Sequence, residues 1–108
     1  MKARHFAVLT AGLPLILANI SLAADAGEAL FKQHNCSMCH APASKSLGPS
    51  LKEIAAKYAG DKQAPAKLET KVRNGGNGVF GTMPMPATAK SVSDADIKAM
   101  VTWILGHK

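Results

Sequence analysis

The sequence has few cysteines, few aromatic residues and no alternating apolar run. Two cysteines in 108 residues exclude both a multi-disulfide scaffold and a four-cysteine metal site. Val, Ile and Thr never form the alternating pattern that indicates β-strands. Charged residues are 19% and hydrophobic residues 47% of the chain, which is typical of a folded protein rather than a disordered one. The length fits a single domain.

The first segment of the chain is typical of a secretory signal peptide. Lys2 and Arg4 form a short positive start, residues 6–20 are apolar, and small residues follow up to Ala23. An uncleaved anchor helix is the alternative, because an apolar stretch of this length almost spans a bilayer. Pro14 and the small residues at the exit favour cleavage.

Cleavage after Ala23, or one residue later, defines two parts of the chain. We expect a signal peptide over residues 1–23 and an exported domain over residues 24–108, located in the periplasm with no stable membrane insertion. Loss of two basic residues leaves eleven basic and seven acidic ones, a net charge of +4. A domain of about 85 residues obtains only ~3–5 kcal/mol from its own core and usually needs an additional stabilising element.

Helix start and stop signals recur through the exported part. A capping pattern predicts a helix from Asp25 to about His34, and a second capping pattern follows Ser50. Pro in a first turn and Asn-Gly as a stop predict a third helix, and an apolar stripe after a Ser cap predicts a fourth. The expected helices cover residues 25–34, 51–60, 65–74 and 93–105.

The motif that carries chemistry is Cys-Ser-Met-Cys-His at residues 36–40. Cys-x-x-Cys-His is the attachment signature of haem c: thiols one helical turn apart reach both vinyl groups, and the adjacent imidazole of His40 faces the iron. Cys36 and Cys39 would form the two thioethers. One covalently bound haem c would also supply the interior that so few aromatic residues cannot fill.

Three other interpretations of the motif are weaker. A thioredoxin-like redox pair needs a βαβ context, which the sequence lacks. A zinc site needs four ligands, and the adjacent Cys39 and His40 are poorly placed to share one ion with Cys36 and His34. A purely structural turn is the third, but free thiols seldom persist in an oxidising compartment without a function.

The second axial ligand of the iron has several candidates. His34 lies too close in sequence to the attachment site, Met100 belongs to an apolar helix stripe, and His107 lies at an exposed terminus. Met83 and Met85 lie in a stretch, residues 75–86, that holds four glycines and two prolines. A thioether is a soft neutral ligand that raises the reduction potential. Position alone does not separate these two methionines.

Across the whole exported part, the chain resembles the short bacterial class I cytochromes c, the monohaem periplasmic carriers that feed nitrite reductases in denitrifying bacteria. The resemblance rests on residues 30–32, 36–40, 48–49, 55–60, 73–75, 78–81, 84–86 and 103–105. It implies an all-α class I cytochrome c fold, with four to five short helices wrapped around a covalently bound haem.

The resemblance also implies roles for particular residues. The family places its axial methionine between two prolines, which selects Met85 and leaves Met83 as the alternative. It implies that the carbonyl of Pro49 accepts a hydrogen bond from His40. It further implies that the first and last helices cross at Gly27, where Phe31 meets Trp103.

Three positions depart from the family pattern. Lys71 and Phe80 stand where the family often has Arg and Trp at a haem propionate, and neither can reproduce the donors that it replaces. Thr88 stands in the region from which an Asn often donates to the methionine sulfur, and its hydroxyl could substitute.

The function implied is a one-electron carrier, not an enzyme, because a His/Met-ligated haem has no vacant site for substrate. We expect a soluble monomer that cycles between Fe(III) and Fe(II), takes electrons from an upstream donor and passes them to a periplasmic reductase, such as nitrite reductase, or to an oxidase. Residues 41–43 and 83–86 would surround the haem edge, and lysines at positions 32, 45, 52, 57, 62 and 90 would jointly steer acidic partners.

A ligand-binding or peroxidase-like haem protein with a displaceable methionine is the alternative function, and a membrane-tethered cytochrome is a third hypothesis. Basic residues scattered among acidic ones, without interleaved aromatics, give no indication of nucleic-acid binding.

Overall fold

The structure is a computed structural model, which describes residue 7, residues 10–12 and residues 18–108. Its elements are helices α1 (Ala18–Gln33), α2 (Leu51–Lys57), α3 (Ala64–Asn74) and α4 (Asp94–Leu105), with a single 3-10 turn, η1 (Cys36–Met38). Within the described ranges the only β-type pairing is one isolated bridge between Gly76 and Met85. The expected all-α class is confirmed.

Helices α3 and α4 begin and end within one residue of the expected bounds, whereas α2 begins at the expected Leu51 but ends at Lys57, three residues before the expected end at residue 60. Ser50 caps α2 with a complete capping box, since its Oγ accepts from the Glu53 N–H while the Glu53 carboxylate accepts from the Ser50 N–H. Ser93 caps α4 by accepting from the N–H of Asp96. Gly75, at φ +68°, ends α3 in a conformation that glycine tolerates best.

The start of the first helix was predicted wrongly. We expected it to begin at Asp25, but α1 begins at Ala18, so Asp25 lies inside the helix. The preceding residues include strong helix formers (Ala18, Leu22, Ala23 and Ala24), and they continue the helix toward the N-terminus. In the chain that still carries residues 1–23, this propensity outweighs the local capping signal.

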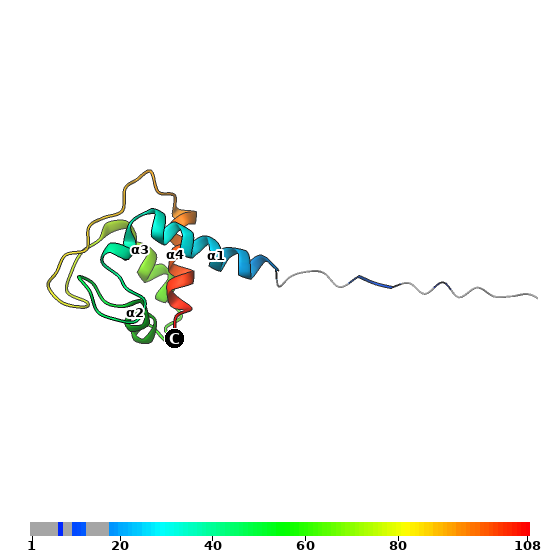
Figure 1. Cartoon of the computed structure of the whole chain (residues 1–108), viewed down its shortest axis with the longest axis horizontal. Helices are drawn as coiled ribbons and strands as arrows, with labels where there is room; N and C mark the ends of the chain where they lie inside the picture. Colours follow the sequence, from blue (N-terminus) through cyan, green and yellow to red (C-terminus); the bar gives the residue numbers. More distant parts are fainter. Residues whose placement is uncertain (1–6, 8–9, 13–17) are drawn as a thin grey trace, which may run out of the picture.

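Helices α1 and α4 cross, and their crossing forms the centre of the core (Figure 1). A Cβ atom at Gly27 would lie 2.5 Å from the Ala99 carbonyl oxygen and 2.6 Å from the Cβ of Trp103. Only glycine permits the two backbones to approach this closely. The Phe31 and Trp103 rings meet with their centroids 5.1 Å apart. Both contacts confirm the expected crossing.

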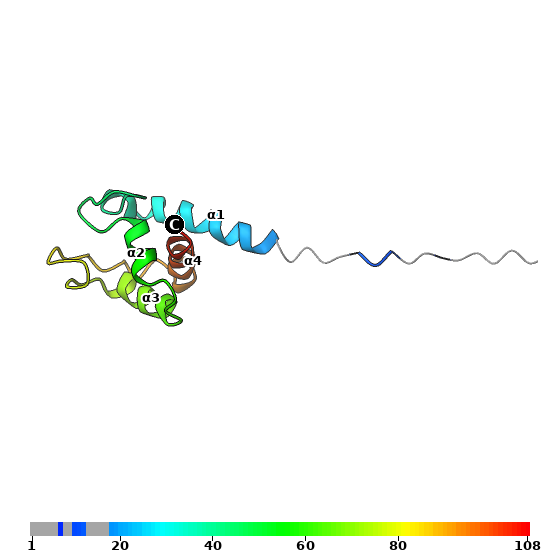
Figure 2. The same cartoon turned by 90° about the horizontal axis from the view of Figure 1, so that it is seen from below.

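The remaining core residues come from all four helices and from Val92, just before α4. The buried apolar cluster consists of Phe31, Leu51, Ile54, Leu68, Val92, Ile97, Met100, Val101 and Ile104. Beyond this core, residues 39–50 and residues 75–93 form two long loops that extend past the helices at the same end of the molecule (Figures 1 and 2). No helix in the described part of the chain is both long and apolar enough to cross a membrane.

Candidate haem site

An apolar cavity lies between the two long loops and the helical core. The residues that the sequence assigns to holding the haem and its iron all line it: Cys36, Cys39, His40, Pro49, Lys71, Phe80, Met83 and Met85. Its inner wall is formed by core side chains, among them Phe31, Ile54, Leu68, Met100 and Ile104. Residues more than forty positions apart in the sequence thus share one site.

The attachment motif forms a compact turn at one side of the cavity. Asn35, at φ +61°, lies two residues after the end of α1 and is the N-cap of η1. The N–H groups of Cys39 and His40 both donate to the Cys36 carbonyl, at 3.2 and 3.1 Å, which brings the two sulfurs to the same wall. Burial raises the pKa of the Cys36 thiol above its usual range, so it stays protonated.

The His40 ring is held in one orientation by the loop that follows it. Its Nδ1 lies 2.8 Å from the Pro49 carbonyl oxygen, which only accepts hydrogen bonds, so Nδ1 carries the proton and donates. The lone pair is therefore on Nε2, the nitrogen that remains available to a metal. The hydrogen bond expected between His40 and Pro49 is present.

Gly48 is a residue whose role the sequence analysis missed, although it noted the Gly-Pro pair. A Cβ atom there would lie 2.7 Å from Cε1 and 3.0 Å from Nδ1 of His40. Its N–H donates to the Cys39 carbonyl at 2.9 Å, which ties the loop back to the motif. A glycine directly before a proline was the available signal, but only the folded structure shows that it contacts the imidazole.

The two candidate methionines differ sharply in their surroundings. The Met85 backbone forms both hydrogen bonds of the isolated bridge: its N–H donates to the Gly76 carbonyl at 2.8 Å, and its carbonyl accepts from the Gly76 N–H at 2.9 Å. Met85 is half-buried, whereas Met83 is 62% exposed. Met100 also lines the cavity but belongs to the core at 1% exposure. His34 and His107 are not among the residues of the cavity wall in the described chain.

Two expectations about the cavity's surroundings were wrong. Residues 41–43 are not among the residues that line it, and the carbonyls of Ala41 and Pro42 accept from the first N–H groups of α2, at 2.9 and 3.1 Å. Leu47 and Val79 line the cavity while staying exposed. The hydroxyl of Thr88 donates to the Val72 carbonyl at 2.6 Å, so its single proton is not directed at a methionine sulfur.

Of the three positions that depart from the family pattern, Lys71 and Phe80 lie at the cavity. Lys71 lines it and carries its ammonium beside Gly76, where a Cβ atom would lie 3.2 Å from Nζ. The Phe80 ring is contacted by the Lys57 ammonium, 5.6 Å from the ring centroid. In the described residues the ion pairs involve Lys32, Lys67 and Arg73, so these two ammonium groups have no carboxylate partner there.

The donor set suits an iron porphyrin. The cavity offers an apolar wall for a flat macrocycle, two thiols on one turn, an imidazole with Nε2 available, and a thioether on a tethered backbone. Lys71 supplies a positive charge for an acidic substituent. The described residues contain no cluster of three His, Cys, Asp or Glu side chains that could hold an ion without such a macrocycle.

Comparisons with known proteins agree with this geometry. The family model described as "Cytochrome c" matches residues 24–108. The chain is 47% identical to cytochrome c-552 of Nitrosomonas europaea over 85 residues, which are 79% of this chain and 82% of that protein. It is 44% identical to cytochrome c-551 of Azotobacter vinelandii over 84 residues, 78% of this chain and all of that protein. The crystal structure of wild-type Nitrosomonas europaea cytochrome c552 superposes with a TM-score of 0.71 at 47% identity, covering 75% of this chain and 99% of that one.

Proposed function

The chain belongs to the cytochrome c family, and from this premise we propose that it is a periplasmic one-electron carrier whose haem is attached through Cys36 and Cys39 and ligated by His40 and Met85. Proteins of this family carry one covalently bound haem c and transfer electrons without being enzymes. The haem supplies the one-electron chemistry, in which iron alternates between Fe(III) and Fe(II).

The observation that carries the ligand assignment is the bridge between Gly76 and Met85. Two hydrogen bonds fix the Met85 backbone at the cavity, whereas Met83 is exposed two residues earlier. The hydrogen bond from His40 to Pro49 leaves Nε2 without a proton, which supports this nitrogen as the other ligand. The neutral nitrogen of His40 and the neutral sulfur of Met85 would both ligate the iron, which would leave it no position for a substrate.

Around this centre, the chain's own residues determine solvent access and charge. The core wall excludes water from the inner face of the cavity, and the exposed Leu47, Val79 and Met83 leave an apolar edge through which electrons can pass. Lys71 would neutralise an acidic substituent of the porphyrin. The Lys57 ammonium adds positive charge beside this edge through its contact with Phe80.

The experiment that tests the function is electron transfer at varied ionic strength. With a domain charge of +4, oxidation of the reduced protein by ferricyanide should slow severalfold between 10 mM and 500 mM salt, because screening weakens attraction to the anion. Oxidation by a cationic cobalt complex is the matched control and should accelerate with salt. Equal, salt-independent rates for both oxidants would contradict steering by the lysines.

The same preparation distinguishes a carrier from a ligand-binding haem protein. A carrier should show a low-spin spectrum with a weak sulfur-to-iron band when oxidised, and its titration should follow a single one-electron curve. A high-spin spectrum would contradict the proposed ligation. We further propose that the electrons pass to a periplasmic reductase, such as nitrite reductase, or to an oxidase, which reconstitution with each purified enzyme would distinguish.

We also propose that residues 1–23 are a signal peptide that is removed on export. The positive start, the apolar run and the small residues before position 24 support this, and the family match also begins at residue 24. N-terminal sequencing of the exported protein should begin at Ala24 or Asp25. Recovery of a chain that retains Lys2 in the membrane fraction would instead support the tethered form.

A further inference from the structure

We propose that Arg73 is a positioning residue that keeps Met85 at the iron by holding the segment which connects Met85 to α4. This segment, residues 86–93, is termed the return segment below. The proposal rests on the proposed ligation by Met85 and adds a residue outside the cavity that controls it. Arg73 lies in the last turn of α3 and is not part of the cavity wall.

The backbone around Met85 is already joined to the end of α3. Beyond the Gly76 bridge, a Cβ atom at Gly75 would collide with the Met85 carbonyl oxygen and would lie 2.8 Å from the Ala87 nitrogen. Thr88 then donates twice, from its N–H to the Arg73 carbonyl at 3.2 Å and from its hydroxyl to the Val72 carbonyl at 2.6 Å. These contacts tie residues 85–88 to residues 72–76.

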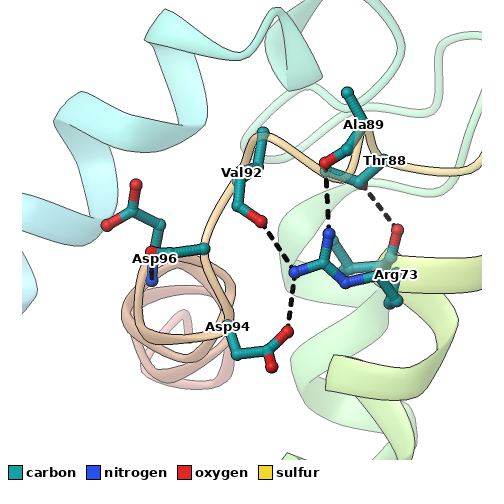
Figure 3. A network of polar contacts seen from close by, with 8 residues as sticks. Arg73, Thr88, Ala89, Val92, Asp94 and Asp96 are labelled. Atoms are coloured by element: carbon teal, nitrogen blue, oxygen red, sulfur yellow. Dashed lines mark hydrogen bonds and ion pairs between the residues drawn. The ribbon is translucent and has the colours of Figure 1, made fainter.

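The Arg73 side chain extends this connection to the rest of the return segment (Figure 3). Its Nη1 donates to the Ala89 carbonyl at 3.1 Å, and its Nη2 donates to the Val92 carbonyl at 2.7 Å and to the Asp94 carboxylate at 2.7 Å. One planar guanidinium thus joins α3, the return segment and the first residue of α4. A lysine has a single donor atom and could not reproduce these directions.

The hydrogen bonds from Arg73 to the two backbone carbonyls contribute more to holding the return segment than its ion pair with Asp94 does. Asp94 is 97% exposed, so water and salt screen its attraction to Arg73. Arg73 is only 25% exposed, and Val92, whose carbonyl it contacts, is buried in the core. Removal of the guanidinium leaves these carbonyls without their charged donor and releases residues 89–93 of the return segment from α3, while the two hydrogen bonds of Thr88 to α3 remain.

Release of the segment would lower the fraction of time that Met85 stays bound to iron. An external ligand competes for that coordination position, and its apparent affinity scales with the fraction of molecules in which the position is open. Imidazole binding to the oxidised holoprotein therefore measures this opening directly. Loss of the sulfur-to-iron band reports the displacement of methionine.

The test compares three variants of the haem-loaded protein. We expect Arg73→Gln to bind imidazole about tenfold more tightly than the unaltered protein, and Arg73→Lys to fall between the two. Asp94→Asn is the matched control: it removes the exposed ion pair but keeps both carbonyl contacts, and its imidazole affinity should stay within twofold. Unfolding by guanidinium, followed at Trp103, measures global stability in parallel.

The outcomes separate this proposal from the one on which it rests. An unaltered protein without the sulfur-to-iron band would overturn ligation by Met85, and the role of Arg73 with it. If the band is present but imidazole binds Arg73→Gln and Arg73→Lys no more than twofold more tightly, Arg73 has no positioning role, whatever happens to global stability. Should Arg73→Gln fail to fold, the result for Arg73→Lys alone decides.

Discussion

Met85→Ala should abolish the sulfur-to-iron band of the oxidised protein and lower its reduction potential by on the order of 200 mV or more, within the ~0.8 V range that axial ligands span. A thioether stabilises ferrous iron, and its loss leaves water or a harder ligand that favours the ferric state. Optical spectra and potentiometric titration of the purified variant measure both changes. Covalent attachment of haem should persist, because the two thioethers do not involve this side chain.

Met83→Ala is the matched control for this prediction. The two methionines are two residues apart in the same loop, yet Met83 is 62% exposed and Met85 is held by the Gly76 bridge. We expect the Met83 variant to keep the band and to shift the potential only slightly. The reverse pattern, with the band lost in Met83→Ala and retained in Met85→Ala, would transfer the ligand assignment to Met83.

The local signals in the sequence were sufficient to predict most of the helices and the haem attachment motif of the candidate site. Capping depends on residues three positions apart, so Ser50 and Ser93 could be identified directly. The haem motif is equally local, since its cysteines and histidine occupy one turn and the residue that follows. Met85 required the resemblance to a family, because two methionines in the same loop are equivalent by position.

The contacts that the sequence did not reveal join residues far apart in the chain. Arg73 reaches residues 16 to 21 positions ahead, and no periodicity or capping rule predicts such a contact. Thr88 was expected near a sulfur, but its hydroxyl donates to Val72, because the end of α3 leaves that carbonyl without a helical partner. The early start of α1 has the opposite cause: a favourable local propensity overrode the Asp25 cap.

Replacement of both Cys36 and Cys39 by alanine should leave a chain without a cooperative unfolding transition. The apolar side chains of the cavity wall, including Ile54 and Leu68, would then face water rather than a bound macrocycle. A domain of about 85 residues has only ~3–5 kcal/mol available from its own core, and exposure of this wall removes much of that. Circular dichroism during urea titration measures the loss as a gradual, non-sigmoidal change in helicity.

Met38→Ala is the control, because this residue lies between the two cysteines but is 73% exposed. It should retain its haem, its colour and a sigmoidal unfolding curve close to that of the unaltered protein. A double cysteine variant that is colourless yet unfolds cooperatively would show that the four helices are stable on their own. In that case the packing between α1 and α4 at Gly27, rather than the haem, would be the main source of stability.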